Sequence, residues 1–144
     1  MAQMKVKPAK DDIKDTLKNS GVRPTRQRVA VYESILLKRD HPTADEIFTR
    51  SRKKLPSISF ATVYNCLETL TQSSLVKQVV FDRSSARYCP NLSPHAHFKC
   101  TESGKIFDLE LDESLVDSIK QSLPEHYSSD NFELTFTGTL NSSN

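Results

Sequence analysis

Three short helices, each preceded by its own capping residue, constrain the fold of this chain more than any other feature. The capping candidates are Thr25, Thr43 and Ser59, each placed just before an apolar repeat. Glu46 follows Thr43 at the spacing of a capping box, in which each side chain can satisfy a backbone amide at the helix start. Tight polar turns separate the helices, and short helices joined in this way are typical of a helix-turn-helix.

The last of these helices has two distinct faces. Val63, Leu67 and Leu70 recur at i, i+4 and i+7, so they form an apolar stripe that faces a core. The residues that face elsewhere are Ala61, Thr62, Tyr64 and Asn65. For Tyr64, a place in the core is the alternative, because an aromatic ring on a short helix often packs inward.

Two strand-like segments follow the helices, at residues 75–81 and 87–89, on either side of the polar turn 82–85. Helices followed by such a hairpin describe a winged helix-turn-helix, which is a DNA-binding architecture. The first half of the chain is therefore predicted to bind DNA.

The pattern changes after Pro90. Strands are predicted at residues 98–100 and 105–109, a helix is capped by Asp112, and residues 132–136 alternate between apolar and polar as a half-buried strand does. Helices and strands in both halves indicate an α+β fold.

Charge is distributed unevenly along the chain. Residues 1–72 carry fourteen Lys or Arg against eight Asp or Glu, whereas residues 73–144 carry six against ten. A basic front half indicates a nucleic-acid-binding module joined to something else. A solvated surface with uneven charge is the alternative that charge alone leaves open.

Metal-ligating side chains are concentrated in one turn-rich segment. Cys89, His95 and His97 form a C-x5-H-x-H array, and Asp108 follows. Residues i and i+2 of an extended strand point to the same side, so His95 and His97 can reach one ion together. Cys89 can approach from the preceding strand and Asp108 from the following one. The sequence predicts a metal site here, with His41 contributed from the first half, although any single histidine can instead be a surface residue.

Membrane insertion and secretion are not expected. No apolar run approaches the roughly 20 residues of a membrane span, and the first ten residues, MAQMKVKPAK, lack the apolar stretch of a signal peptide. Three cysteines at irregular spacing argue against a disulfide scaffold and fit a reducing compartment. We therefore expect a cytoplasmic protein.

Taken together, these residues resemble the ferric uptake regulator (Fur) superfamily of metal-dependent transcriptional repressors. The resemblance covers nearly the whole chain, and the order and spacing of its motifs are more specific than any one of them. The motifs are R-P-T-R-Q-R at 23–28, HPTADEIF at 41–48, ATVYN at 61–65, LVK at 75–77, ARY at 86–88, HAH at 95–97 and SGKIFD at 103–108.

The resemblance implies a domain organisation and two kinds of partner. A winged-helix DNA-binding domain at residues 1–85 is expected to lead through a hinge at 86–92 into a small α/β dimerisation domain at 93–144. A homodimer is expected to read a palindromic operator in double-stranded DNA.

By position in the motifs, the helix that carries ATVYN is expected to enter the major groove. Tyr64 and Asn65 are then the base contacts, because tyrosine can touch a thymine methyl and asparagine can read adenine. Arg23 is expected to reach into the minor groove. Thr62 and Arg28 are expected to contact phosphates or to serve helix caps.

The resemblance also implies one regulatory divalent metal per subunit, at the hinge. Its ligands, carried over by position, are His41, Cys89, His95, His97 and Asp108. Ligands drawn from both sides of a hinge let an ion set the angle between domains, and so the spacing of the two recognition helices in a dimer. Loss of the ion is then expected to release DNA.

The chain departs from the family pattern at the structural zinc, which two CxxC pairs commonly hold. The first pair here runs from Cys100 to Ser103, and the second from Thr139 to Ser142. Hydroxyls do not replace thiolates on structural zinc. We therefore expect no structural zinc, with Cys100 left as a small buried residue or a free thiol.

The nature of the metal and of the signal divides the branches of this family. Asn65, Asp108 and the HPTADEI stretch are more like the peroxide-sensing branch (PerR), for which Fe²⁺ or Mn²⁺ is expected. Cys89 instead favours Zn²⁺ and a zinc-sensing branch (Zur), because a thiolate with imidazoles suits zinc. Our prediction is a peroxide-responsive repressor, with zinc sensing or iron sensing as alternatives.

Two further alternatives lie outside this scheme. A zinc enzyme could leave an open position for water beside Cys89, His95 and His97, but the segment has no helical H-x-x-E motif to supply a general base. We therefore predict no catalytic residues. A winged-helix protein that has lost metal control is the other alternative, and unchanged operator affinity after joint substitution of His95 and His97 would favour it.

Overall fold

A computed structural model of the chain describes residues 10–81 and 85–141 and divides the protein into two compact units, Met1–Asn91 and Leu92–Asn144. The division falls inside the segment 86–92, which the sequence assigns to a hinge. The described residues contain five helices and five short strands, so the predicted α+β class is confirmed. None of the helices in these two ranges is long and apolar enough to cross a membrane.

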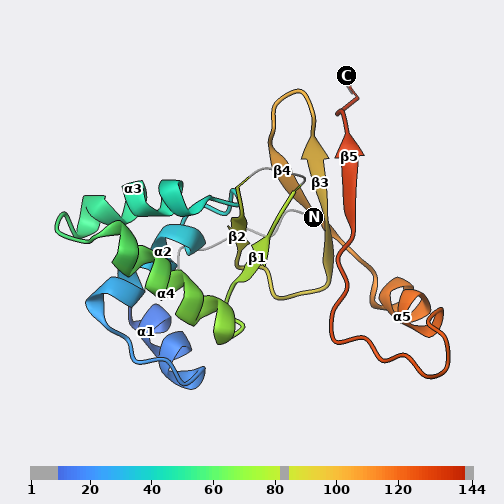
Figure 1. Ribbon diagram of the computed structural model, residues 1–144, viewed down its shortest axis with the longest axis horizontal. Coiled ribbons are helices and arrows are strands. Elements are labelled where there is room, and N and C mark those ends of the chain that lie inside the picture. The colour runs from blue at the N-terminus through green and yellow to red at the C-terminus, as the bar shows by residue number, and fades with distance from the viewer. Residues whose placement is uncertain (1–9, 82–84, 142–144) are drawn as a thin grey trace. The chain divides into compact units, whose positions relative to one another are not determined.

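In the first unit, the described residues form four helices followed by a two-stranded hairpin (Figure 1). The hairpin pairs β1 (Lys77–Val79) antiparallel with β2 (Arg87–Cys89), and residues 82–84 of its predicted turn lie outside the described residues. Strand β2, which the sequence predicts as the second strand of the wing, belongs to this unit. The helices are α1 (Lys10–Asn19), α2 (Arg26–Leu36), α3 (Ala44–Lys54) and α4 (Phe60–Gln72).

Side-chain oxygens cap three of these helices as the sequence predicts. The Oγ1 atoms of Thr25 and Thr43 accept hydrogen bonds from the amides of Arg28 and Glu46, at 3.2 and 3.3 Å. The Oγ atom of Ser59 accepts one from the amide of Thr62 at 3.1 Å. Each helix begins at the residue after its cap, because the cap satisfies an amide that the first helical turn leaves without an intrahelical partner.

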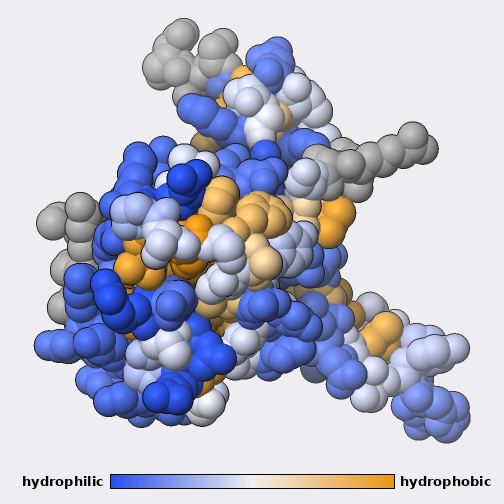
Figure 2. All heavy atoms as spheres, turned by 60° about the vertical axis from the view of Figure 1, so that its left-hand side comes forward, coloured by the Kyte–Doolittle hydropathy of each residue, from blue (hydrophilic) through white to orange (hydrophobic). Residues whose placement is uncertain are grey.

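The core of this unit lies where α2, α3 and α4 pack against one another. Val63, Leu67 and Leu70 of α4 are at most 1% exposed, and Ile35 of α2 and Ile47 of α3 are fully buried beside them. This packing fixes which side of α4 faces outward. Figure 2 shows hydrophilic residues over most of the visible surface of this unit.

The second unit is a three-stranded sheet accompanied by one helix. Strand β3 (His95–Cys100) lies between β4 (Ile106–Glu110), to which it is antiparallel, and β5 (Thr135–Gly138), to which it is parallel. Asp112 caps α5 (Glu113–Gln121), as predicted.

Two strands of this sheet differ from the sequence-based prediction. Strand β3 begins at His95 rather than at Phe98, because its antiparallel pairing with β4 continues back to His95. Strand β5 runs from Thr135 to Gly138 rather than over residues 132–136, and Phe136, predicted on the buried face of the strand, is 48% exposed. The central strand therefore carries both predicted histidine ligands, and the edge strand β5 carries a solvent-exposed aromatic side chain.

Candidate functional site

The outward face of α4 carries the residues that the sequence predicts to contact DNA. Tyr64 is 50% exposed and Asn65 is exposed, whereas Thr62 is half-buried beside the Ser59 cap. A place in the core for Tyr64 is therefore excluded. Arg23 is exposed ahead of α2, and its backbone carbonyl accepts a hydrogen bond from Nη1 of Arg28 at 3.1 Å.

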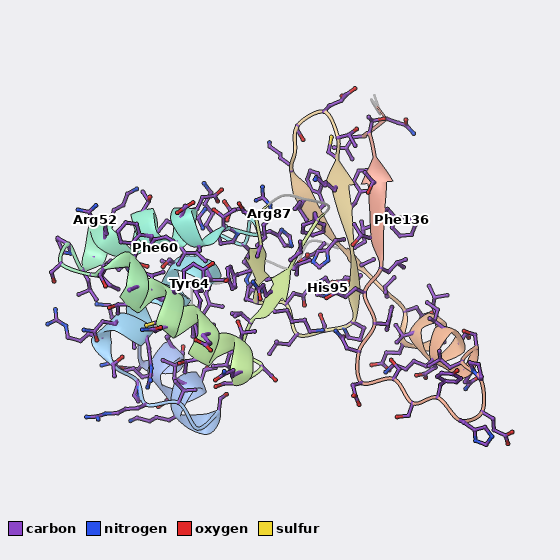
Figure 3. All side chains as sticks on the ribbon, in the orientation of Figure 1. Arg52, Phe60, Tyr64, Arg87, His95 and Phe136 are labelled. Atoms are coloured by element: carbon purple, nitrogen blue, oxygen red, sulfur yellow. The ribbon has the colours of Figure 1, made fainter. Side chains whose placement is uncertain are left out.

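Phe60, which was not among the predicted site residues, packs directly against Tyr64. Figure 3 shows Phe60 and Tyr64 on α4. Their ring centroids are 5.4 Å apart, and the Phe60 ring also meets Phe48 of α3 edge-on at 5.4 Å. Residues four apart on a helix share one face, so this spacing was the signal available in the sequence. The contacts restrict the directions in which the Tyr64 side chain can leave the helix.

The first unit holds two of the predicted metal ligands, both buried. His41 is 3% exposed in the turn between α2 and α3, and Cys89 is 1% exposed at the end of β2. The turn is tied to that strand, because the amide of Tyr88 donates to the carbonyl of Pro42 at 3.0 Å. The sequence segments that carry an imidazole and a thiol thus lie side by side within this unit.

The second unit brings three other predicted ligands together. His97 lies opposite Asp108 in the register of β3 and β4, and His97 Nε2 is 3.3 Å from Asp108 Oδ1. The Nε2 atoms of His95 and His97 are 3.1 Å apart, and His95 Nε2 is 3.7 Å from the same carboxylate oxygen. Two ligand atoms about 2.1 Å from one ion at the tetrahedral angle lie roughly 3.4 Å apart. The spacing of the three donors therefore fits a shared ion.

The backbone carbonyl of Ser93 orients the His95 ring. It lies 2.7 Å from His95 Nδ1, and a carbonyl can only accept, so Nδ1 carries the proton. In the neutral ring Nε2 is then the unprotonated nitrogen, which is the form that binds a metal ion. A backbone carbonyl behind a ligating histidine is a common feature of metal sites.

At the positions where the family pattern has the thiols of a structural zinc site, this chain has one cysteine and several hydroxyl side chains. Cys100 is buried at the end of β3, and hydrogen bonds from the Ser103 side chain and then from the Ser103 amide hold the pKa of its thiol below the ordinary value. Thr139 is exposed, and Ser142 lies outside the described residues. In contrast, burial raises the pKa of the Cys66 thiol on α4.

Comparison of this sequence with known proteins gives a family match and several similar proteins. The sequence profile of the ferric uptake regulator family matches residues 19–137. A Bacillus subtilis (strain 168) protein named peroxide operon regulator is 43% identical over 94 residues, which are 65% of this chain and 65% of that protein. A Staphylococcus epidermidis protein named peroxide-responsive repressor PerR is 37% identical over 111 residues, which are 77% of this chain and 72% of that protein.

The fold is also shared with a solved structure. The crystal structure of the Campylobacter jejuni peroxide stress regulator superimposes with a TM-score of 0.69 at 26% sequence identity, over 90% of this chain and 94% of that one. The family match and the named relatives together identify a metal-dependent, DNA-binding transcriptional regulator. The chain belongs to the ferric uptake regulator family, which confirms the resemblance that its motifs indicate.

Proposed function

We propose that this chain is a metal-dependent, peroxide-responsive repressor that binds operator DNA as a homodimer in the cytoplasm. The observation that carries the proposal is the convergence of His95, His97 and Asp108 within the second unit. Relatives at 43% and 37% identity are named as peroxide regulators, which supports this branch of the family and favours regulation over zinc catalysis.

The proposed regulatory ligands are His41 and Cys89 from the first unit and His95, His97 and Asp108 from the second. These residues would hold a ferrous ion, which would supply one electron to hydrogen peroxide, whereas Mn²⁺ held by the same donors would not supply that chemistry. Ligands from two units give the protein a way to couple ion binding to the arrangement of its halves. The residues of this chain hold the ion, exclude water around the buried His41 and Cys89, and keep His95 in its metal-binding tautomer.

Zinc sensing is the second candidate, and the buried Cys89 thiol favours it. A thiolate with imidazoles prefers zinc, while a shell of nitrogen and oxygen suits iron or manganese. With Cys89, His95 and His97 joined by His41 or Asp108, four donors are enough for a tetrahedral site. We propose no structural zinc, since only Cys100 remains of the two CxxC pairs.

Metal dependence of DNA binding is the direct test of this proposal. The operator is first selected from random duplexes in the presence of Mn²⁺, and binding is then followed by fluorescence anisotropy. We expect a chelator to abolish binding and added Mn²⁺ to restore it. Equal operator affinity with and without chelator would instead support a winged-helix protein without metal control.

We propose that Tyr64 and Asn65 read bases, that Arg23 enters the minor groove, and that Thr62 contacts phosphate. Asn65→Ala should lower operator affinity by about 1–3 kcal/mol, roughly 5- to 150-fold, because a bidentate contact to adenine is lost. Anisotropy titration measures the loss, and Gln72→Ala, at the far end of the same helix, is the matched control. Unchanged affinity and unchanged selected sequences for Asn65→Ala would remove this residue from the interface.

We propose that the second unit forms the dimer contact. Large apolar side chains are exposed on its strands: Phe107 at 38%, Leu109 at 39% and Phe136 at 48%. Phe136→Ser should therefore shift the protein from dimer to monomer at micromolar concentration, as measured by sedimentation velocity. Tyr127→Ser, which changes a ring that is 69% exposed outside the strands, should leave the dimer intact. A dimer that persists in the Phe136 variant would place the contact elsewhere.

A further inference from the structure

His41 adopts a backbone conformation that its sequence position disfavours. Its φ is +56°, in the left-handed region, and the next residue is Pro42. A side chain at Cβ crowds the left-handed conformation, and a following proline pushes the preceding residue toward extended backbone. Such a conformation persists only where surrounding contacts hold it, and it often marks a functional position.

Strand β2 supplies contacts that hold this turn. Nη1 of Arg87 donates a hydrogen bond to the His41 carbonyl at 2.9 Å, across 46 positions of sequence. Thr43 forms an isolated antiparallel bridge with Arg87, and the Tyr88 amide donates to the Pro42 carbonyl at 3.0 Å. Residues 41–43 thus lie beside β2 within the first unit, held by one isolated bridge and two hydrogen bonds.

The contact to His41 differs from the others in its chemistry. It comes from a side chain, so it depends on the identity of residue 87, whereas the two backbone contacts form with any residue there. A guanidinium also makes a stronger hydrogen bond to a carbonyl than a neutral donor does. Figure 3 shows Arg87 on the hairpin wing of the first unit.

We propose that Arg87 is a positioning residue for the metal ligand His41. By holding the His41 carbonyl it keeps the residue in the left-handed conformation, which fixes the direction of the Cα–Cβ bond and so of the imidazole. Without it, His41 can relax toward extended backbone, and its ring leaves the ligand position. The inference rests on the proposed role of His41 as a ligand and adds a residue outside the ligand set.

The inference also links the wing to the proposed site. Arg87 lies two residues before Cys89 on β2, so one short strand carries one proposed ligand and positions another. Thr43, which bridges Arg87, is the N-cap of α3. A change at residue 87 is therefore expected to alter metal binding without any contact to the ion.

The test is a double-mutant cycle on Co²⁺ affinity, measured by absorption of the cobalt-loaded full-length protein. Arg87→Met should weaken Co²⁺ binding by about tenfold, as expected for loss of a group that orients a ligand. Arg87→Lys keeps a donor and should lose roughly threefold. Arg39→Met removes an exposed positive charge two residues before His41 and is the matched control, expected to stay within about twofold.

The decisive comparison is made in the His41→Ala background. If Arg87 acts through His41, Arg87→Met adds no more than about a twofold further loss to His41→Ala. Additive losses, or Co²⁺ affinity unchanged in Arg87→Met while His41→Ala weakens it, would overturn the positioning role alone. Unchanged affinity in His41→Ala would overturn His41 as a ligand and the role of Arg87 with it. If the methionine variant does not fold, the lysine variant carries the cycle, and its roughly threefold loss should then vanish in the His41→Ala background; a roughly threefold loss that persists there would overturn the positioning role.

Discussion

His97→Ala is expected to weaken divalent metal binding by about a hundredfold and to abolish metal-dependent operator binding. Zinc bound by four ligands in small domains gains roughly 10–16 kcal/mol, so one ligand accounts for about 3 kcal/mol of that total. His97 is buried on the central strand, and its Nε2 lies 3.1 Å from His95 and 3.3 Å from Asp108. No neighbouring residue on β3 can take its place, because Ala96 and Phe98 point to the other face.

The control for this variant is His126→Ala. His126 is the chain's remaining histidine and is exposed after α5, so its loss should leave metal affinity and operator binding unchanged. Calorimetric titration with Mn²⁺ and Zn²⁺ measures the affinities, and anisotropy measures operator binding. Metal affinity equal to that of the unsubstituted protein in His97→Ala would remove the cluster in the second unit from the regulatory site.

Leu67→Ala should lower the stability of the first unit by about 2–5 kcal/mol, because it leaves a cavity in a tightly packed core. Leu67 is 1% exposed on the inner face of α4, among Val63, Leu70 and Ile35. The same helix carries the proposed base contacts on its other face, so operator affinity should fall as the helix loses its support.

Urea unfolding followed by far-ultraviolet circular dichroism measures the effect. Leu37→Ala removes the same number of atoms from a leucine that is 37% exposed at the end of α2, and its cost should stay below about 1 kcal/mol. A similar small cost for Leu67→Ala would contradict the assignment of this face of α4 to the core.

Local sequence signals predict where three helices of the first unit begin. Thr25, Thr43 and Ser59 are short-range signals, because each cap bonds an amide only three residues away. The period of the apolar residues then decides which side of each helix is buried. The same period places Tyr64 and Asn65 on the outward face of α4, where both side chains are exposed.

Features that depend on distant residues are harder to predict. The start of β3 at His95 depends on pairing with β4 fifteen residues later, and no local signal marks it. Strand β5 pairs in parallel with β3, and its Phe136 side chain is exposed. This pairing depends on the long connection between β4 and β5, which contains α5. The left-handed conformation of His41 is a further case, since its sequence position before a proline predicts extended backbone.

The candidate site also has some features that the local sequence predicts and others that depend on residues elsewhere in the chain. Spacing alone predicts His95 and His97 on one side of a strand, and their rings meet with centroids 4.6 Å apart. The support around the ligands is not predicted, because Ser93 acts through its backbone carbonyl and Arg87 acts across 46 positions. Arg87 belongs to the ARY motif, but neither that motif nor the residue type at position 93 indicates which group each one contacts.

Peroxide sensing through a metal held by these residues can be tested on the protein itself. The most direct measurement loads the full-length protein with Fe²⁺ under anaerobic conditions, adds a brief low dose of hydrogen peroxide, and maps oxidised peptides by mass spectrometry. A zinc-loaded sample treated in the same way is the control. We expect oxygen addition at His41 or His95 in the iron-loaded sample alone, together with loss of operator binding. Oxidation confined to cysteines, or zinc bound so tightly that Fe²⁺ cannot replace it, would contradict peroxide sensing and indicate a thiol switch or a zinc sensor.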